Sequence, residues 1–175
     1  MVTIRDIDRV RIALAPTRTI SHTMTNNDTL HLIAQALELD PATLLAIYPK
    51  PHSGIDEARV AAWLKKEGDP GFEPCGNTNL IQLLNGLIDH KRGPREGGPR
   101  PPEHVLNNNV VFMKLKIALN LQAEDILKIL ARQNIQLSKH ELSALFRNRD
   151  HKHYRECLDP LLRAFVQGLR ARSGE

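Results

Sequence analysis

The chain repeats itself without a gap at a spacing of 82 residues. Twelve of the sixty-two positions from residue 26 to residue 87 are identical to the position 82 residues later. A repeat in constant register indicates a duplicated structural unit, and two copies are fewer than the ~3 that a solenoid needs. We therefore expect a pseudo-symmetric pair of modules. The identical positions of the first copy are Asn26, Asn27, Ala36, Leu37, Leu39, Leu45, Ile47, Ala62, Cys75, Leu80, Gly86 and Leu87.

Both copies show helical periodicity. In the second copy, Val111, Leu115, Ala118 and Leu119 recur at the spacing of one helix face. Aromatic residues make up only 4% of the chain, which favours a helical core over a sheet. No segment alternates as a strand does. The sequence predicts an all-α fold of two homologous four-helix modules in pseudo-symmetric tandem.

Helix starts are marked by capping residues. Asp40 before Pro41 opens the second helix of the first copy, and Asp159 before Pro160 opens the last helix of the second. Ser138 with Glu141 three residues later forms a capping box, and we expect that helix to run through Phe146. For the fourth helix of the first copy we expect Asn77 or Thr78 as the cap.

A segment rich in Gly, Pro and Arg separates the copies. Gly93 follows Lys91 and Arg92 as a helix-ending glycine, and the prolines beyond it cannot continue a helix. We expect the first helical repeat at residues 24–89, a linker at 90–106 and the second repeat at 107–172.

The two copies carry opposite net charge. Residues 26–87 hold four Lys or Arg against eight Asp or Glu, whereas residues 108–175 hold twelve against seven. A basic half can meet a phosphate backbone or an acidic protein face, although a charge difference also arises from differently solvated surfaces.

The densest basic run lies at residues 147–155, between the third and fourth helices of the second copy. Cations, histidines and an aromatic residue suit a phosphate backbone, with Tyr154 available for stacking. Tyr154 also matches Phe72 of the first copy, which favours a core position for its ring. The candidate residues for binding nucleic acid or an acidic partner are Arg147, Arg149, Lys152, His153 and Arg155, with Lys91 and Arg92.

Cysteine and histidine give weaker signals. Cys75 and Cys157 could be thiols activated near a helix start, but a small buried residue used twice is the simpler interpretation. His151, His153 and Cys157 could ligate zinc, yet no fourth ligand is evident. We therefore assign no catalytic residue, no metal and no cofactor.

Residues 115–130 resemble a helix-turn-helix. The second helix of a DNA reader needs basic or amide side chains at its start, but Glu124 and Asp125 stand there. We expect this segment to be a packing unit.

From Met24 to Arg172 the chain resembles the YehS-like family of bacterial proteins, itself a tandem repeat of unknown function. The resemblance implies that residues 1–23 are an N-terminal extension, with Met24 as a candidate true start. Arginines there leave open a genuine phosphate-binding arm. Asn77 stands where the family usually has aspartate. Asparagine caps a helix equally well, so this difference bears on any function of a carboxylate at this position and not on the fold. The resembling strings begin at Asn26, Trp63, Leu84, Lys91, Asn107, Asp150 and Tyr154.

The sequence predicts a non-catalytic binding module whose basic second repeat contacts nucleic acid or an acidic protein. One alternative is a homotypic interaction module that pairs acidic and basic halves into a homo-oligomer. Another is an enzyme of a type that no motif identifies. Two cysteines indicate a reducing cytoplasm, and the absence of a long apolar run argues against a membrane span.

Overall fold

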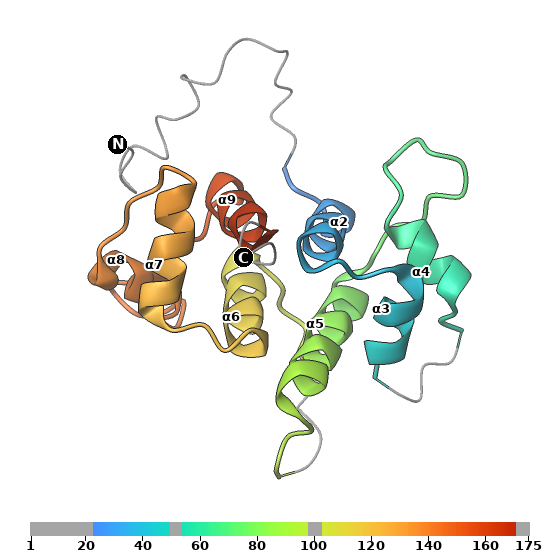
Figure 1. The fold of residues 1–175 in the computed structure, drawn as a ribbon, viewed down its shortest axis with the longest axis horizontal. Helices are drawn as coiled ribbons and strands as arrows, with labels where there is room; N and C mark the ends of the chain where they lie inside the picture. Colours follow the sequence, from blue (N-terminus) through green and yellow to red (C-terminus); the bar gives the residue numbers. More distant parts are fainter. Residues whose placement is uncertain (1–22, 50–53, 98–102, 171–175) are drawn as a thin grey trace. The chain divides into compact units, whose positions relative to one another are not determined.

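The computed structural model describes residues 23–49, 54–97 and 103–170. Within these ranges the regular structure consists of eight helices and no strand (Figure 1). The helices are α2 (Asn26–Leu37), α3 (Pro41–Ile47), α4 (Glu57–Trp63), α5 (Asn77–Arg92), α6 (Asn108–Ala118), α7 (Ala123–Arg132), α8 (Lys139–Leu145) and α9 (Asp159–Arg170).

The predicted duplication is confirmed by the helices themselves. Each of α6, α7, α8 and α9 begins 82 residues after its counterpart among α2, α3, α4 and α5. The packing also recurs, because α3 contacts α4 and α5 just as α7 contacts α8 and α9. The all-α fold of two four-helix repeats in tandem is therefore correct.

Most of the predicted helix starts are found. Asp40 accepts a hydrogen bond from the Thr43 amide at 2.7 Å and caps α3. Ser138 and Glu141 form the expected capping box of α8, although that helix ends at Leu145 and Phe146 is its C-cap. α9 begins at Asp159 itself, one residue earlier than expected.

The predicted cap of α5 is wrong. Gly76 is the N-cap, and Asn77 is the first helical residue. The Oδ1 atom of Asn77 accepts a hydrogen bond from the Asn26 amide at 2.8 Å, so this side chain joins α5 to α2 instead of capping its own helix.

By contacts the chain forms two compact units, whose boundary differs from that of the sequence repeat. One unit spans Thr25–Asn120 and holds α2 to α6, and α7 to α9 belong to the other. α6 therefore packs with the helices of the first repeat, and its main neighbour there is α5. Met24 belongs with the unit that holds α7 to α9, and its backbone amide donates to the carboxylate of Asp159 at 2.8 Å.

Lys114 of α6 joins this helix both to the segment before it and to α5. The ammonium group of Lys114 lies 2.8 Å from the carboxylate of Glu103 and donates to the Asn85 side chain at 2.7 Å. The Lys114 side chain is 8% exposed and the Glu103 side chain 31%. This contact holds the segment that precedes α6 against α5.

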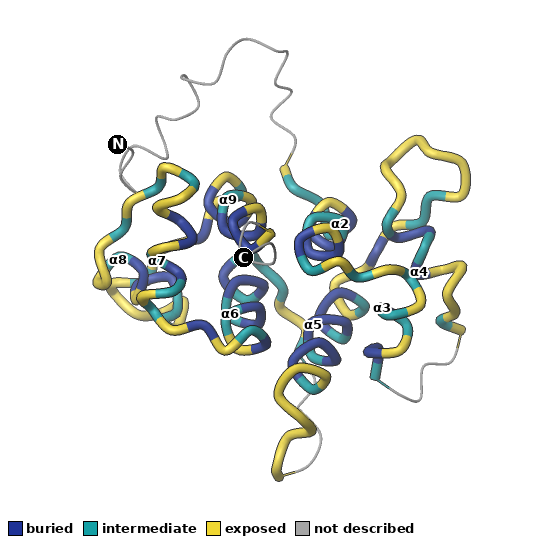
Figure 2. The backbone as a smooth tube through the Cα atoms, viewed as in Figure 1, coloured by how far each residue is buried: buried dark blue, intermediate teal, exposed yellow. Residues whose placement is uncertain are grey.

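Leucine, isoleucine and valine fill the interior of each unit, with Trp63, Phe112 and Phe165 as the largest buried side chains. Figure 2 shows buried and exposed residues alternating along the helices. The core of the first repeat leaves a void of only about 10 Å³ among leucine and isoleucine side chains. A void of this size is too small for a ligand.

Several predictions fall outside the described residues. Of the N-terminal extension at residues 1–23, only Thr23 is described, and residues 98–102 of the linker are not. Among the described helices, none is by itself long and apolar enough to span a membrane, and α2 with α3 passes that test only as a pair bent by 101°.

Candidate nucleic-acid interface

The candidate site is the segment between α8 and α9, residues 147–156, which we call the basic loop. Its counterpart in the first repeat, residues 65–74 between α4 and α5, is the acidic loop. Both are ten residues long, but the basic loop has four Lys or Arg against two Asp or Glu, and the acidic loop has two against three. Two histidines, His151 and His153, add to the basic loop.

The two loops are held by the same backbone hydrogen bonds. Each has two turn bonds of the i to i+3 type and one bond back to the preceding helix. In the acidic loop these run from Asp69 to Lys66, Phe72 to Asp69 and Glu73 to Ala62, and in the basic loop from His151 to Asn148, Tyr154 to His151 and Arg155 to Ala144. The repeat therefore fixes where the loop leaves and rejoins the helices.

Local conformation still differs between the loops. Gly68 and Gly71 of the acidic loop have positive φ, whereas Asp150 and His153 at the matching positions do not. Positive φ is costly for residues with a side chain, so glycine is favoured at these two positions of the acidic loop. The basic loop has no positive φ there and accepts other residues. These positions carry charged or ionisable side chains instead.

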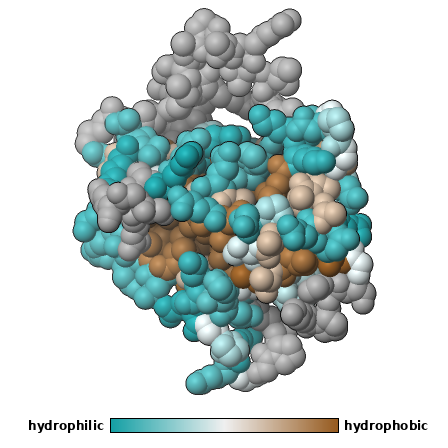
Figure 3. All heavy atoms as spheres, turned by 45° about the vertical axis from the view of Figure 1, so that its right-hand side comes forward, coloured by the Kyte–Doolittle hydropathy of each residue, from teal (hydrophilic) through white to brown (hydrophobic). Residues whose placement is uncertain are grey.

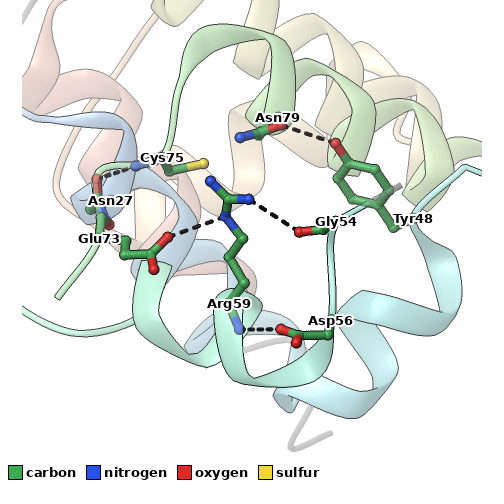
Figure 4. A network of polar contacts seen from close by, with 8 residues as sticks. All are labelled: Asn27, Tyr48, Gly54, Asp56, Arg59, Glu73, Cys75 and Asn79. Carbon is green, nitrogen blue, oxygen red and sulfur yellow. Dashed lines mark hydrogen bonds and ion pairs between the residues drawn. The ribbon is translucent and has the colours of Figure 1, made fainter. Parts of the chain in front are cut away.

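The acidic loop uses three of its five charged side chains internally. The Lys65 ammonium donates to the Pro70 carbonyl at 2.7 Å, and the Asp69 carboxylate accepts from the Lys66 amide at 3.0 Å. Glu73 pairs with Arg59 of α4 at 3.1 Å, as Figure 4 shows. Its side chains thus stabilise the loop itself.

Three of the four cations of the basic loop are not used in this way. Within the described part of the chain, no ion pair or side-chain hydrogen bond engages Arg147, Arg149 or Lys152. Arg149 and Lys152 are exposed, and Arg147 is half-buried. These three cations therefore have no ion-pair or hydrogen-bond partner within the described ranges, and two of them are exposed to solvent.

Arg155 differs from the other three cations. It occupies the position of Glu73, while Glu141 of α8 occupies that of Arg59, so the signs of charge at this pair of positions are reversed between the repeats. The amide of Arg155 donates to the Ala144 carbonyl at 3.1 Å. The site therefore rests on the other three cations more than on Arg155.

The structure adds a residue that sequence reasoning missed. His140, on the first turn of α8, lies beside the predicted His153 with ring centroids 6.2 Å apart, and His151 lies 5.6 Å from His153. The hydrogen bond from the Arg155 amide to the Ala144 carbonyl folds the loop back along α8. The spacing of the histidines in the sequence does not predict this contact.

Tyr154 is half-buried, as is its counterpart Phe72. Desolvation raises the pKa of the Tyr154 hydroxyl, and the nearby charge of Glu156 raises it further. Its ring is therefore partly a packing group and only partly available to a stacked base.

Both thiols are buried and chemically quiet. Burial raises the pKa of Cys75 and of Cys157 to about 12. Figure 4 shows how the buried Asn27 side chain accepts a hydrogen bond from the Cys75 amide at 2.9 Å. Because the thiolate is the nucleophile, protonated thiols do not support the catalytic reading.

The other sequence-predicted cations belong to the first repeat. Lys91 and Arg92 are exposed on the last turn of α5, in the other compact unit. Asp125 at the start of α7 forms a capping box with Gln122, and Glu124 pairs with Lys139 at 2.6 Å. The Lys139 hydrogen bond lowers the pKa of Glu124, so α7 presents negative charge at its start.

In the described residues, no group of three His, Cys, Asp or Glu side chains is arranged to hold a metal ion.

Hydrophilic residues border a band of apolar ones on the face that Figure 3 shows. The most exposed large apolar side chains are Val105, Ile117 and Leu158, and none of these lies in the basic loop. The loop thus suits a polar, anionic partner.

The two four-helix repeats define the class of this molecule as a tandem-repeat helical protein. The family model described as protein of unknown function, DUF1456, matches residues 26–93 and again residues 108–173. The chain belongs to this family. It is 41% identical over 150 residues to the uncharacterized protein YehS of Escherichia coli (strain K12), an alignment that covers 85% of this chain and 96% of that protein. No solved structure matches the chain significantly.

Proposed function

We propose that the protein is a non-catalytic binding module that contacts the phosphate groups of nucleic acid through its basic loop. The observation that supports this is the contrast between the loops. The acidic loop engages Lys65, Asp69 and Glu73 within its own repeat. By contrast, no ion pair or side-chain hydrogen bond among the described residues engages Arg147, Arg149 or Lys152.

These side chains suit phosphate. A guanidinium group offers a planar fork of donors that matches two phosphate oxygens, and lysine adds a mobile point charge. Each neutralised phosphate releases condensed counterions, so three contacts give a salt slope of about −3 on duplex DNA. Phosphate contacts carry no sequence information, so we expect binding that is general in sequence.

Two other partners share this chemistry. An acidic protein surface presents carboxylates, which pair with guanidinium groups in the same geometry. A second copy of the chain presents the acidic loop, which has the same length and opposite charge. We favour nucleic acid over a second copy because Glu73 of the acidic loop already pairs with Arg59 and Asp69 already accepts from a backbone amide. An acidic protein is distinguished from nucleic acid by the experiment below. The involvement of Lys91 and Arg92 stays a prediction.

The test compares one protein with three polyanions. Fluorescence anisotropy at low salt would measure the affinity for a short DNA duplex, a single-stranded RNA and polyglutamate. The loop variant is R147Q/R149Q/K152Q, and the matched control K66Q/K128Q/R163Q removes three exposed cations outside the loop. We expect the loop variant to lose at least about tenfold in affinity for nucleic acid, and the control far less.

Other outcomes would redirect the proposal. Tighter binding of polyglutamate than of DNA and RNA would indicate an acidic protein as the partner. Concentration-dependent self-association that the loop variant abolishes would indicate homotypic pairing. Equal binding by the parent and the loop variant would overturn the role of the basic loop.

A further inference from the structure

We infer that His140, His151 and His153 form part of the same binding surface and make its affinity for a polyanion rise as the pH falls. This inference rests on the proposed function, since it concerns the regulation of that surface. It assigns to the surface one residue, His140, that lies outside the loop sequence.

The three imidazoles come together from two elements. His140 is on α8, and His151 and His153 are in the loop that folds back along it. The ring centroids of His140 and His153 are 6.2 Å apart, and those of His151 and His153 are 5.6 Å apart. All three residues are exposed. A polyanion on the basic loop would therefore meet the imidazoles as well as the cations.

The grouping is confined to the basic repeat. The first repeat has Ala58, Asp69 and Gly71 at the three corresponding positions. One of these is an acid and two cannot ionise. The imidazoles thus occur in the copy that carries the basic loop and have no counterpart at the matching positions of the other copy.

Charged groups of both signs surround the cluster. The acids nearest in sequence are engaged or exposed: Glu141 accepts hydrogen bonds from Ser138, and Asp150 is exposed. From α7, Glu124 pairs with Lys139, which removes that lysine as a free charge. The other charged side chains on these two elements are Arg147, Arg149, Lys152, Arg155 and Glu156.

The direction of the pH effect follows from linkage. Histidine side chains gain their charge between pH 8 and pH 5, and phosphate groups next to them favour the charged form. Binding a polyanion then takes up protons, so affinity rises as the pH falls through this range. Arg and Lys stay charged throughout, so they cannot supply this dependence.

The number of added charges is two or three. His151 accepts a hydrogen bond at Nδ1 from the His153 amide at 3.1 Å, and a proton at Nδ1 would replace that bond. Three imidazoles therefore set an upper limit of three added charges, and the bond to His151 sets the lower figure of two. Each added phosphate contact steepens the salt slope by about 0.9 on duplex DNA.

The experiment measures the salt slope of binding to a short DNA duplex at pH 8.0 and at pH 5.5, with a chelator present. In the parent we expect the slope to steepen by about two to three between these pH values. The variant H140Q/H151Q/H153Q should show the same slope at both. The control H104Q, which removes an exposed histidine from the segment before α6, should behave as the parent. A melting curve at each pH confirms that the variants are folded.

A second variant keeps the inference testable if glutamine disturbs the loop. H140R/H153R should bind at pH 8.0 with the steeper slope of the parent at pH 5.5. Salt-dependent binding whose slope is equal at both pH values in the parent would overturn this inference while leaving the proposed function intact. Absence of salt-dependent binding at both pH values would overturn the proposed function as well.

Discussion

Gly86 of α5 packs directly against the main-chain carbonyl of Ile47 in α3, with no room for a side chain between them. The same relationship recurs between Gly168 of α9 and Ile129 of α7, where an added Cβ would lie 2.6 Å from the Ile129 side chain and 3.1 Å from its carbonyl oxygen. All four residues belong to the 82-residue repeat. This close approach of two helices therefore explains the glycine that both copies share at this position.

Replacing Gly86 with alanine should destabilise the protein by about 1–3 kcal/mol, because the added methyl group meets rigid backbone. Gly168→Ala should cost less, since its nearest obstacle is a side chain that can shift. Gly76→Ala meets no atom within 4 Å, so its loss should be limited to the weaker N-capping by alanine, about 1 kcal/mol or less. Denaturant unfolding measures all three, and a Gly86→Ala protein as stable as the parent would contradict the packing described.

Asn27 should be the most sensitive polar residue of the first repeat. Its amide group donates to the carbonyls of Trp63 and Glu73 at 2.9 and 2.8 Å, and its oxygen accepts from the Cys75 amide. Asn27→Asp places a carboxylate oxygen against two carbonyls, and buried unsatisfied groups cost about 1–3 kcal/mol each. We expect a loss of several kcal/mol by chemical denaturation. The neighbouring Asn26→Ala should cost about 1 kcal/mol, and similar losses for both would contradict the assignment.

The repeat, its helical character and most of its helix starts could be predicted because they depend on local sequence. Ser138 and Glu141 identify a cap without any tertiary information. The cap of α5 could not be predicted, since Asn77 bonds to Asn26, which is distant in sequence. The basic loop was evident from its composition, but His140 joined it only through the fold. The placement of α6 with α5 depends on packing that the repeat does not encode.

The buried ion pair of α6 should respond unequally to removal of its two partners. Glu103→Gln leaves the Lys114 ammonium buried with only neutral partners, which should cost about 3 kcal/mol or more. Lys114→Met leaves a carboxylate that is 31% exposed and can be hydrated, so it should cost less. Thermal or denaturant unfolding gives both values. The reverse order would show that the lysine is not held as described.

The two thiols should make the protein lose stability at alkaline pH. Each has a pKa raised to about 12 in the folded state, so the folded protein retains protons that the unfolded chain releases above about pH 9. The contribution of the thiols to the free energy of unfolding is fully present below that pH. It declines as the pH rises, by about 3 kcal/mol per thiol at pH 11. Unfolding at pH 7.5, 9 and 10.5 measures this. The double variant C75A/C157A should show a flatter profile, and an equally steep one would assign the loss to other groups.

The salt slope of DNA binding tests the central claim most directly. At pH 7.5 it would be measured for the parent, for R147Q/R149Q/K152Q and for the charge-matched K66Q/K128Q/R163Q on one duplex. If the basic loop holds the phosphates, the loop variant should lose about three units of slope, while the control keeps that of the parent. If the loop variant and the parent share one slope, or if both triple variants lose it equally, the basic loop is not the binding site.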